Sequence, residues 1–453
     1  MDRQSANSCN WYDVTAWPHG DPYTDIGEVI NSIISDVKER QRASDLNDGG
    51  KPGAVINIPP GDYRLRTQIL IDISFLRIQG AGHGFTSSSI RFNVPRDEWA
   101  GLHELWPGGS RVLVDLDVPE GAEQSEGAAI RVARRGSPRI SSVELSGFCI
   151  DGLHFEADEK AGNPENSYLN GKTGVYVADA NDSFRISEMG FVYLEHALTI
   201  CKADALSVHD NFIAECGSCI ELLDWGQASK ITDNLIGAGP VGHSIYAENH
   251  GGLLVSSNNV FPRGRSSIHL SGVSRSSVTG NRLHAFYPGM VLLVANSSEN
   301  LVAANHLLRD HEPWAPFLEI GNGLDDQYGL LRIEGSENSV IANHFSVAVD
   351  SAARQRESGG VVAVRLASGS GNYVASNHVV AHDVRVTGGS SAFEAQVSAL
   401  LAATRDDGDL NVTTVLVDAA APRNTVLDSG TKSQVVLDAE VNAFRATPGI
   451  GGS

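Results

Sequence analysis

Short stretches of alternating apolar and polar residues fill the middle of the chain, and one phrase among them recurs at nearly constant intervals. The phrase is Val or Ile, two variable residues, Asn, and an apolar residue two places later, as in VHDNFI at Val208 and ITDNLI at Ile231. Its asparagines are separated by 23, 24, 23, 24, 38 and 34 residues and stand at Asn211, Asn234, Asn258, Asn281, Asn305, Asn343 and Asn377. A period in the twenties indicates a solenoid, in which each coil of chain lies one layer above the previous one.

The composition of the repeats favours strands over helices. The repeats are short β-branched stretches broken by Gly, Asn and Ser, and they lack the apolar stripe of period 3.6 that helical repeats need. They also lack the regular leucines of leucine-rich repeats. The pattern therefore predicts an all-β protein with a right-handed parallel β-helix, whose coils are ~4.8 Å apart. Asparagine suits a corner of such a coil because it tolerates left-handed backbone and can form a ladder of side-chain amides.

A second row of residues supports this register. The segments CIEL at 219–222, SIYA at 244–247 and SIHL at 267–270 align at the same position of three coils. Alternation along a strand predicts that their isoleucines point inward, and that the following residues stack on the outside. The inward set is Ile220, Ile245 and Ile268, and the outward set is Glu221, Tyr246 and His269.

The two ends of the solenoid need covering, because an open coil presents unpaired strand edges. Residues 24–41 predict an amphipathic helix with Thr24 or Asp25 as its N-cap, and we expect this helix to cap the N-terminal end. The expected organisation is an N-terminal segment over 1–55, a β-helix over 56–430 and a C-terminal tail over 431–453. Two breaks in the period predict insertions near 308–322 and 385–412. The first insertion carries Trp314 and Phe317, and a lid and a packing loop explain it equally well.

Composition narrows the possible partners. The formal charge of −21 argues against nucleic acid and anionic membranes as partners, and no apolar stretch is long enough to span a membrane. The first residues lack the features of a signal peptide, so a cytoplasmic protein is expected, or an extracellular one if a leader has been removed. Cys216 and Cys219 form a C-x-x-C pair without a companion pair, which favours small buried thiols over a metal site. No metal or organic cofactor is expected.

The segment 205–227 carries the densest set of polar residues. Asp210 and Glu221 are 11 residues apart on either side of the turn AECGS, so a bend in the coil could bring their carboxyls together. Two nearby carboxyls suit glycosidic chemistry, in which one protonates the leaving oxygen and the other stays ionised. However, acidic residues at coil corners also bind backbone N–H groups. Strict alternation from an inward Val208 would moreover turn Asp210 inward, unless the chain bends at Asn211. Spacing alone leaves both interpretations open.

Longer phrases carry a resemblance to a known family. The segments 171–198, 205–222, 261–266, 281–290 and 321–329 resemble the inulin fructotransferases and difructose anhydride III (DFA-III) hydrolases. The resemblance implies a right-handed β-helix assembled as a homotrimer with active sites near the subunit interfaces. It also implies that the catalytic pair of the phrase D-N-x-I-A-E-C-G-x-C-x-E falls on Asp210 and Glu221. On this basis we expect Glu221 to be the general acid, and Asp210 the nucleophile, base or cation stabiliser.

The family contains two reactions, and both need the same pair. The hydrolase opens DFA-III to inulobiose, whereas the transferase releases the anhydride from inulin. The missing signal peptide favours the hydrolase, and so does the segment 239–252, which departs from a transferase pattern with acidic residues near Val241 and Gly251. The fructose-containing substrate is expected to contact Asn211, Trp225, Tyr246 and His269.

Two readings outside the family remain. A carbohydrate-binding or structural β-helix, such as a tailspike-like adhesin, would keep the asparagine ladder but would not need the carboxyl pair. A polysaccharide lyase would call for a calcium cluster or a basic residue against uronates, and the charge of −21 speaks against it.

Overall fold

The computed structural model describes most of the chain and divides it into two compact units, Met1–Gly237 and Ala238–Ser453. The described residues are 10–43, 53–84, 101, 108–134, 140–152, 169–178, 182–237, 242–261, 264–310, 321–349, 360–383, 412–428, 434–437 and 442–445. No helix in these ranges is long and apolar enough to cross a membrane.

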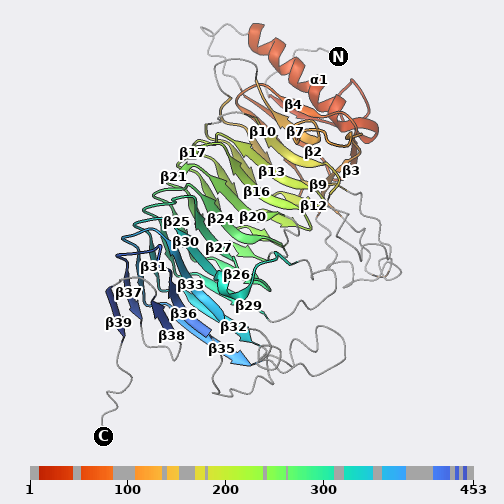
Figure 1. The fold of residues 1–453 in the computed structure, drawn as a ribbon. Coiled ribbons are helices and arrows are strands. Elements are labelled where there is room, and N and C mark those ends of the chain that lie inside the picture. Colours follow the sequence, from red (N-terminus) through yellow and green to blue (C-terminus); the bar gives the residue numbers. More distant parts are fainter. Residues whose placement is uncertain are drawn as a thin grey trace. The chain divides into compact units, whose positions relative to one another are not determined.

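The first unit is built from three parallel sheets, called A, B and C (Figure 1). Sheet A contains β1 (Trp11–Asp13), β2 (Ala54–Ile58), β5 (Leu76–Gly80), β8 (Glu144–Ser146), β11 (Arg185–Ser187), β14 (Ser207–His209) and β18 (Lys230–Thr232). Sheet B contains β3 (Gly61–Leu65), β6 (Ser110–Val114), β9 (Cys149–Asp151), β12 (Gly190–Val192), β15 (Phe212–Ala214) and β19 (Leu235–Ile236). Sheet C contains β4 (Ile69–Ile71), β7 (Ala128–Val132), β10 (Thr173–Val177), β13 (His196–Cys201) and β16 (Ser218–Leu223).

The second unit repeats this plan. Taken by itself, its sheet A contains β22 (Leu254–Ser256), β25 (Ser277–Thr279), β28 (Leu301–Ala303), β31 (Ser339–Ile341), β34 (Tyr373–Ala375), β37 (Thr425–Asp428) and β39 (Asn442–Arg445). Sheet B has β23 (Asn259–Val260), β26 (Arg282–Ala285), β29 (His306–Arg309), β32 (His344–Val349) and β35 (His378–Asp383). Sheet C has β20 (His243–Glu248), β24 (Ser266–Ser271), β27 (Val291–Val294), β30 (Leu331–Glu334), β33 (Val361–Ser368), β36 (Val412–Val417) and β38 (Gln434–Leu437).

Each coil visits sheet C, sheet A and sheet B in turn before it returns to sheet C one layer on. The strands β13, β14, β15 and β16 trace one such coil, and β13 pairs in parallel with β16. This is the right-handed parallel β-helix that the repeat predicts. The predicted register is also confirmed, because Ile220, Ile245 and Ile268 are fully buried. Their outward neighbours Tyr246 and His269 are paired on adjacent strands.

The asparagine ladder is present, with one change from the expected backbone. In each described unit the ladder asparagines are at most 4% exposed, and the amide of one donates to the carbonyl oxygen of the next at 2.9 to 3.0 Å, as from Asn211 to Asn234 and from Asn281 to Asn305. The left-handed residue is not the asparagine but the one before it, such as Asp210 (φ 56°). This residue makes the corner between sheets A and B, and the asparagine that follows it turns into the core.

A second ladder lies at another corner of the second unit, and the sequence reasoning missed it. Its amides are joined at 3.0 to 3.1 Å along Asn300, Asn338, Asn372 and Asn424. The first three stand five residues before a ladder asparagine of the first row, which is the signal that could have identified them. Two rows of buried amides therefore fix the register of this unit.

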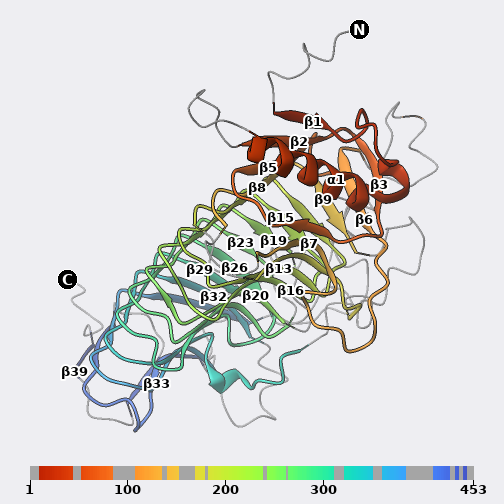
Figure 2. The ribbon, with the colours of Figure 1, turned by 90° about the horizontal axis from the view of Figure 1, so that it is seen from above.

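The helix α1 (Pro22–Ala43) packs on β2, β3 and β4 at the N-terminal end of the first unit (Figures 1 and 2). Asp25 has extended backbone (φ −155°, ψ 96°) within it, so the main helix begins at Ile26. The carboxylate of Asp25 accepts hydrogen bonds from the N–H of Gly27 at 3.0 Å and of Arg66 at 3.1 Å. Asp25 is thus the N-cap, as predicted, and it also ties the helix to the first coil.

Two of the expected boundaries shift. The N-terminal segment contributes β1, which pairs with β2 although α1 lies between the two strands in the sequence. Residues 431–453 contribute β38 and β39, which pair with β36 and β37. The coils therefore begin before residue 56 and continue past residue 430. β1 pairs with a segment 44 residues away, and β38 and β39 lack the repeat phrase, so the repeat does not reveal either change. The predicted insertion over 385–412, apart from Val412 at the start of β36, and most of the one over 308–322 lie outside the described residues.

Candidate active site

Asp210 lies on the outside of a corner. β14 ends at His209, and the left-handed backbone of Asp210 turns the chain toward β15. Its side chain is 59% exposed, with Oδ2 at 2.8 Å from Nδ1 of His209. The bend falls at Asp210 and not at Asn211, so the inward direction that strict alternation would give does not arise.

Glu221 lies on the outer face of sheet C, in the middle of β16. Its neighbours Ile220 and Leu222 point into the core, whereas its own side chain is 13% exposed. Oε2 of Glu221 accepts hydrogen bonds from the hydroxyl of Thr199 at 3.0 Å and lies 2.8 Å from Nδ1 of His196. Both partners belong to β13, whose register places Thr199 directly beside Glu221.

These contacts determine the protonation of Glu221. Burial raises its pKa, but the hydrogen bond and charge of His196, together with hydrogen bonds from Thr199 and Ser218, outweigh burial and hold the pKa below its usual range. Glu221 is therefore held as a carboxylate. A general acid at neutral pH needs a raised pKa, so the environment of this chain opposes the acid role expected for Glu221.

A single chain does not bring the two carboxyls together. Asp210 stands where sheet A meets sheet B, and Glu221 is on sheet C, so the strand β15 and a second corner at Glu215 (φ 55°) separate them. β15 alone spans about 10 Å. Outward side chains on different faces of a coil also diverge. The bend at AECGS therefore moves the carboxyls apart within one chain, contrary to expectation.

His196 and Glu195 complete the surroundings of Glu221, and the sequence reasoning missed both as site residues. Nε2 of His196 is 3.9 Å from Oε1 of Glu195, and Oε2 of Glu195 accepts a hydrogen bond from the N–H of Gly171 at 2.7 Å. The imidazole thus lies between two carboxylates. The available signal was the repeat itself, since His196 pairs with Ser218, three residues before Glu221.

The residues expected to contact substrate differ in their exposure. Asn211 is 2% exposed, and its amide is bound to Asn234 and to the carbonyl of Ile186. It is therefore a structural residue, and its expected contact with substrate is wrong. Trp225, in the turn after β16, is 46% exposed and stays a candidate for stacking on a sugar.

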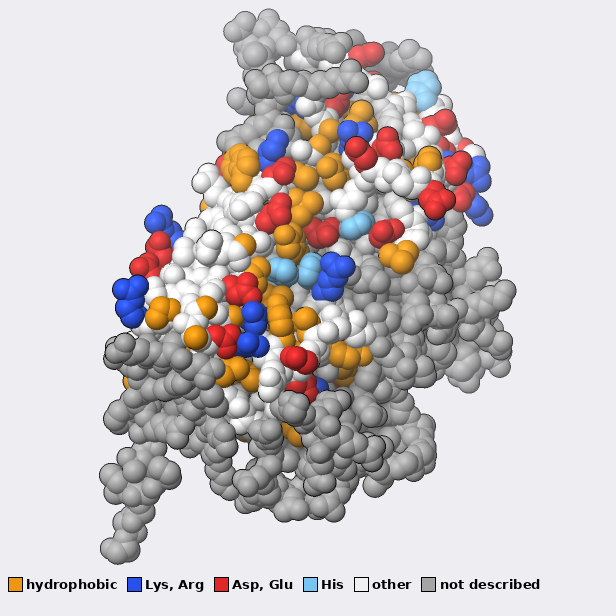
Figure 3. Space-filling view, viewed as in Figure 1, with side chains coloured by type: hydrophobic (Ala, Val, Ile, Leu, Met, Phe, Trp, Pro, Cys, Tyr) orange, Lys and Arg blue, Asp and Glu red, His pale blue; other side chains and the backbone are white. Residues whose placement is uncertain are grey.

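Tyr246 and His269 form an aromatic cluster with His243 on sheet C of the second unit. The ring centroids of Tyr246 and His269 are 5.1 Å apart, and those of His243 and His269 are 4.6 Å apart. Burial lowers the pKa of His269 to about 4, so its ring is neutral at ordinary pH. Figure 3 shows histidine and acidic side chains among hydrophobic ones on the face over the sheet C strands. Such a surface offers both stacking and hydrogen bonds to a sugar.

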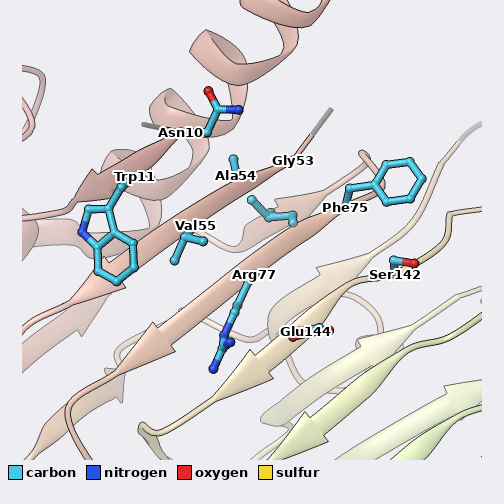
Figure 4. Close-up of a pocket in the computed structure, with 10 residues that line it drawn as sticks. Asn10, Trp11, Gly53, Ala54, Val55, Phe75, Arg77, Ser142 and Glu144 are labelled. Atoms are coloured by element: carbon cyan, nitrogen blue, oxygen red, sulfur yellow. The ribbon is translucent and has the colours of Figure 1, made fainter. Parts of the chain in front are cut away.

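A shallow pocket of about 440 Å³ lies elsewhere, over the first strands of sheet A (Figure 4). Trp11 and Phe75 lie on either side of it, and Arg77 and Glu144 lie between them. None of the predicted site residues lines this pocket.

The described residues contain no group of three or more His, Cys, Asp or Glu placed to hold a metal ion. The four cysteines in the described ranges are buried, as predicted, and Cys216 and Cys219 are fully enclosed. Cys9 lies outside those ranges.

Two protein-family models match parts of the chain. The one described as "Beta helix repeat of Inulin fructotransferase" matches residues 304–448. The one described as "Periplasmic copper-binding protein (NosD)" matches residues 130–314. Each match covers less than half of the chain.

Individual proteins match over much more of the chain. An inulin fructotransferase [DFA-I-forming] of Arthrobacter globiformis is 41% identical over 383 residues, which are 82% of this chain and 89% of that protein. The crystal structure of a DFA-IIIase from Arthrobacter chlorophenolicus A6 in complex with GF2 is 68% identical, with a TM-score of 0.87 over 98% of this chain and 100% of that one. The same enzyme in complex with DFA-III matches equally, over 98% and 99% of the two chains.

Proposed function

This chain belongs to the family of the inulin fructotransferases and DFA-IIIases, and we propose from that premise that it hydrolyses DFA-III to inulobiose. The observation that carries the proposal is the 68% identity to a DFA-IIIase over 98% of the chain, against 41% to a transferase. The likeness to the DFA-IIIase also extends through the coil that bears Asp210 and Glu221. The alternative within the family is a transferase that releases an anhydride from inulin.

Hydrolysis requires one proton donor and one carboxylate. Water adds across a glycosidic bond, so the leaving fructosyl oxygen gains a proton and the anomeric carbon gains the oxygen of water. Glu221 suits the ionised role, because its partners hold it as a carboxylate. It would stabilise the developing cation or take the proton of the attacking water. Proton donation then falls to Asp210, the other member of the pair; its side chain is 59% exposed in the single chain, so this role requires that a neighbouring subunit enclose it. This assignment reverses the roles expected from the sequence.

The positions of the two carboxyls support an assembly in which the site is shared. A protomer presents Asp210 at the corner of sheets A and B and Glu221 on sheet C, so neither face holds a complete pair. In a closed ring of identical subunits, one face of each protomer meets a different face of its neighbour. A homotrimer of this kind would place Asp210 of the partner subunit against Glu221.

The deciding experiment incubates the protein separately with DFA-III, DFA-I and inulin, followed by chromatography of the products. Inulobiose from DFA-III is the expected result. Release of an anhydride from inulin without net hydrolysis would establish the transferase instead.

Replacement of the pair separates an enzyme from a sugar-binding β-helix. Asp210→Asn and Glu221→Gln are each expected to lose turnover by at least about 100-fold. If both variants kept near-wild-type turnover, the catalytic assignment would fail.

A further inference from the structure

Glu221 is held by directed hydrogen bonds as well as by burial on the outer face of sheet C. One of its oxygens, Oε2, is approached by two donors from the adjacent coil, Nδ1 of His196 at 2.8 Å and the hydroxyl of Thr199 at 3.0 Å. Behind the imidazole, Glu195 lies 3.9 Å from Nε2 and is itself fixed by the N–H of Gly171 at 2.7 Å. A chain of fixed groups therefore runs from the backbone at Gly171 through Glu195 and His196 to Glu221.

The parallel register makes this chain rigid. β13 and β16 pair with Thr199 beside Glu221 and with His196 beside Ser218, so three side chains converge from two hydrogen-bonded strands. Thr199 is fully buried and the side chain of His196 is 21% exposed. Groups held on strands keep their geometry better than groups on loops do. The carboxylate is thus held in one orientation before substrate arrives.

We propose that His196 is a positioning residue for catalysis: with Glu195 behind it and Thr199 beside it, it holds the carboxyl of Glu221 in one orientation. This inference rests on the proposed function, because it concerns the same site. It assigns a role to a histidine that does not itself need to touch the substrate.

The electrostatics agree with the geometry. Burial alone would raise the pKa of Glu221, and the hydrogen bond and charge of His196 are the largest of the influences that lower it. The other hydrogen-bond partners of Glu221, the hydroxyls of Thr199 on β13 and of Ser218 on its own strand, are neutral, and the carboxyl of Glu195 lies behind the imidazole. A charge-assisted hydrogen bond is stronger than a neutral one, so Thr199 alone would not replace His196.

The sign of the pH effect follows from this arrangement. If Glu221 must be ionised, activity rises as pH increases through its pKa, which sets the acidic limb of the profile. Loss of His196 raises that pKa, so the acidic limb should move to higher pH. A merely structural loss would lower activity at every pH and leave the limb in place.

The test compares His196→Asn, which keeps a donor near Nδ1 but removes the charge, with Glu195→Gln and Thr199→Val. We expect His196→Asn to lower kcat on DFA-III by on the order of tenfold to 100-fold with little change in KM, and to shift the acidic limb upward. Glu195→Gln should give a smaller shift in the same direction. His19→Asn is the matched control, because His19 is exposed and belongs to another part of the unit.

A measurement without substrate separates this inference from the proposed function. Carbodiimide reacts with protonated carboxyls, so the labelling of the Glu221 peptide against pH, read by mass spectrometry, reports the titration of that carboxyl. Its midpoint should rise in His196→Asn and stay unchanged in His19→Asn. An unmoved midpoint and acidic limb in folded His196→Asn would overturn the positioning role. Failure of the wild-type protein to open DFA-III would overturn the proposed function, while the labelling would still test His196.

Discussion

A mixture of two inactive variants tests whether Asp210 and Glu221 act within one chain or across two. In one chain they lie on different faces of the coil, with about 10 Å of sheet B between the corner at Asp210 and the turn before sheet C. Cooperating carboxyls of glycosidases are only about 5 to 9.5 Å apart, and the outward direction of both side chains increases their separation. We therefore expect each site to combine Glu221 of one subunit with Asp210 of the partner subunit.

The size of the effect follows from counting sites in a cyclic trimer. In Asp210→Asn the subunit keeps Glu221, and in Glu221→Gln it keeps Asp210. Any trimer that contains both variants has one interface of the productive order, so about one third of its sites should be intact. Coexpression with two affinity tags, followed by purification on both, isolates such mixed trimers. Their turnover of DFA-III should be about one third of the wild-type value, although each variant alone is inactive.

One outcome would refute a site shared between two subunits. If doubly tagged assemblies were no more active than either variant alone, the site would lie within one subunit or the assembly would not be cyclic. Light scattering on the purified protein supplies the control, because a trimer has three times the chain mass of 48.2 kDa.

Three further predictions concern stability and pH. Asn281→Ala removes a buried amide that donates to Asn305 and to the carbonyl of Val255, so denaturant unfolding should show a loss of roughly 2 to 4 kcal/mol, whereas the exposed Asn259→Ala should change little. Asp25→Ala removes the cap of α1 and its bonds to the first coil; it should cost about 1 to 3 kcal/mol and speed hydrogen exchange in α1, and an unchanged exchange rate there would contradict the capping role. His269 has a pKa of about 4 when folded, against about 6.5 when unfolded, so the unfolded state binds more protons between these values and stability falls as pH drops through them, by at most about 3 kcal/mol. His269→Gln should lose less melting temperature than the wild type between pH 7 and pH 4.5, and equal losses would refute the assignment.

The coiled architecture could be predicted from the sequence because its physical cause recurs in every coil. Inward isoleucines such as Ile268 alternate with outward residues, and a buried amide such as Asn281 needs a partner one layer away. Both requirements select the same residue types at the same position of each coil, so they appear in the sequence as a repeat. β1 precedes the first repeat phrase and β39 follows the last, so neither strand carries the phrase, and both were missed although each adds a strand to the sheet of its own unit.

The candidate site was predictable only in part, for a geometric reason. A spacing of 11 residues between Asp210 and Glu221 does not say how many corners lie between them. Left-handed residues at Asp210 and Glu215 make two corners, so the second carboxyl emerges on another face. The contacts of Glu221 with His196 cross from one coil to the next. Such contacts become visible only once the register of the two strands is known.

The corner between sheets A and B explains why a repetitive scaffold can carry a catalytic group there. In coil after coil the residue before the ladder asparagine is left-handed and exposed, and its identity varies from Asp233 to Ser257, Gly280 and Ala304. The buried asparagine fixes the backbone, which leaves the preceding side chain free of any packing role. Asp210 occupies this position, and asparagine tolerates left-handed backbone at least as well as aspartate does. Asp210→Asn should therefore leave stability almost unchanged, so a loss of turnover in that variant reports on the chemistry of the carboxyl and not on the fold.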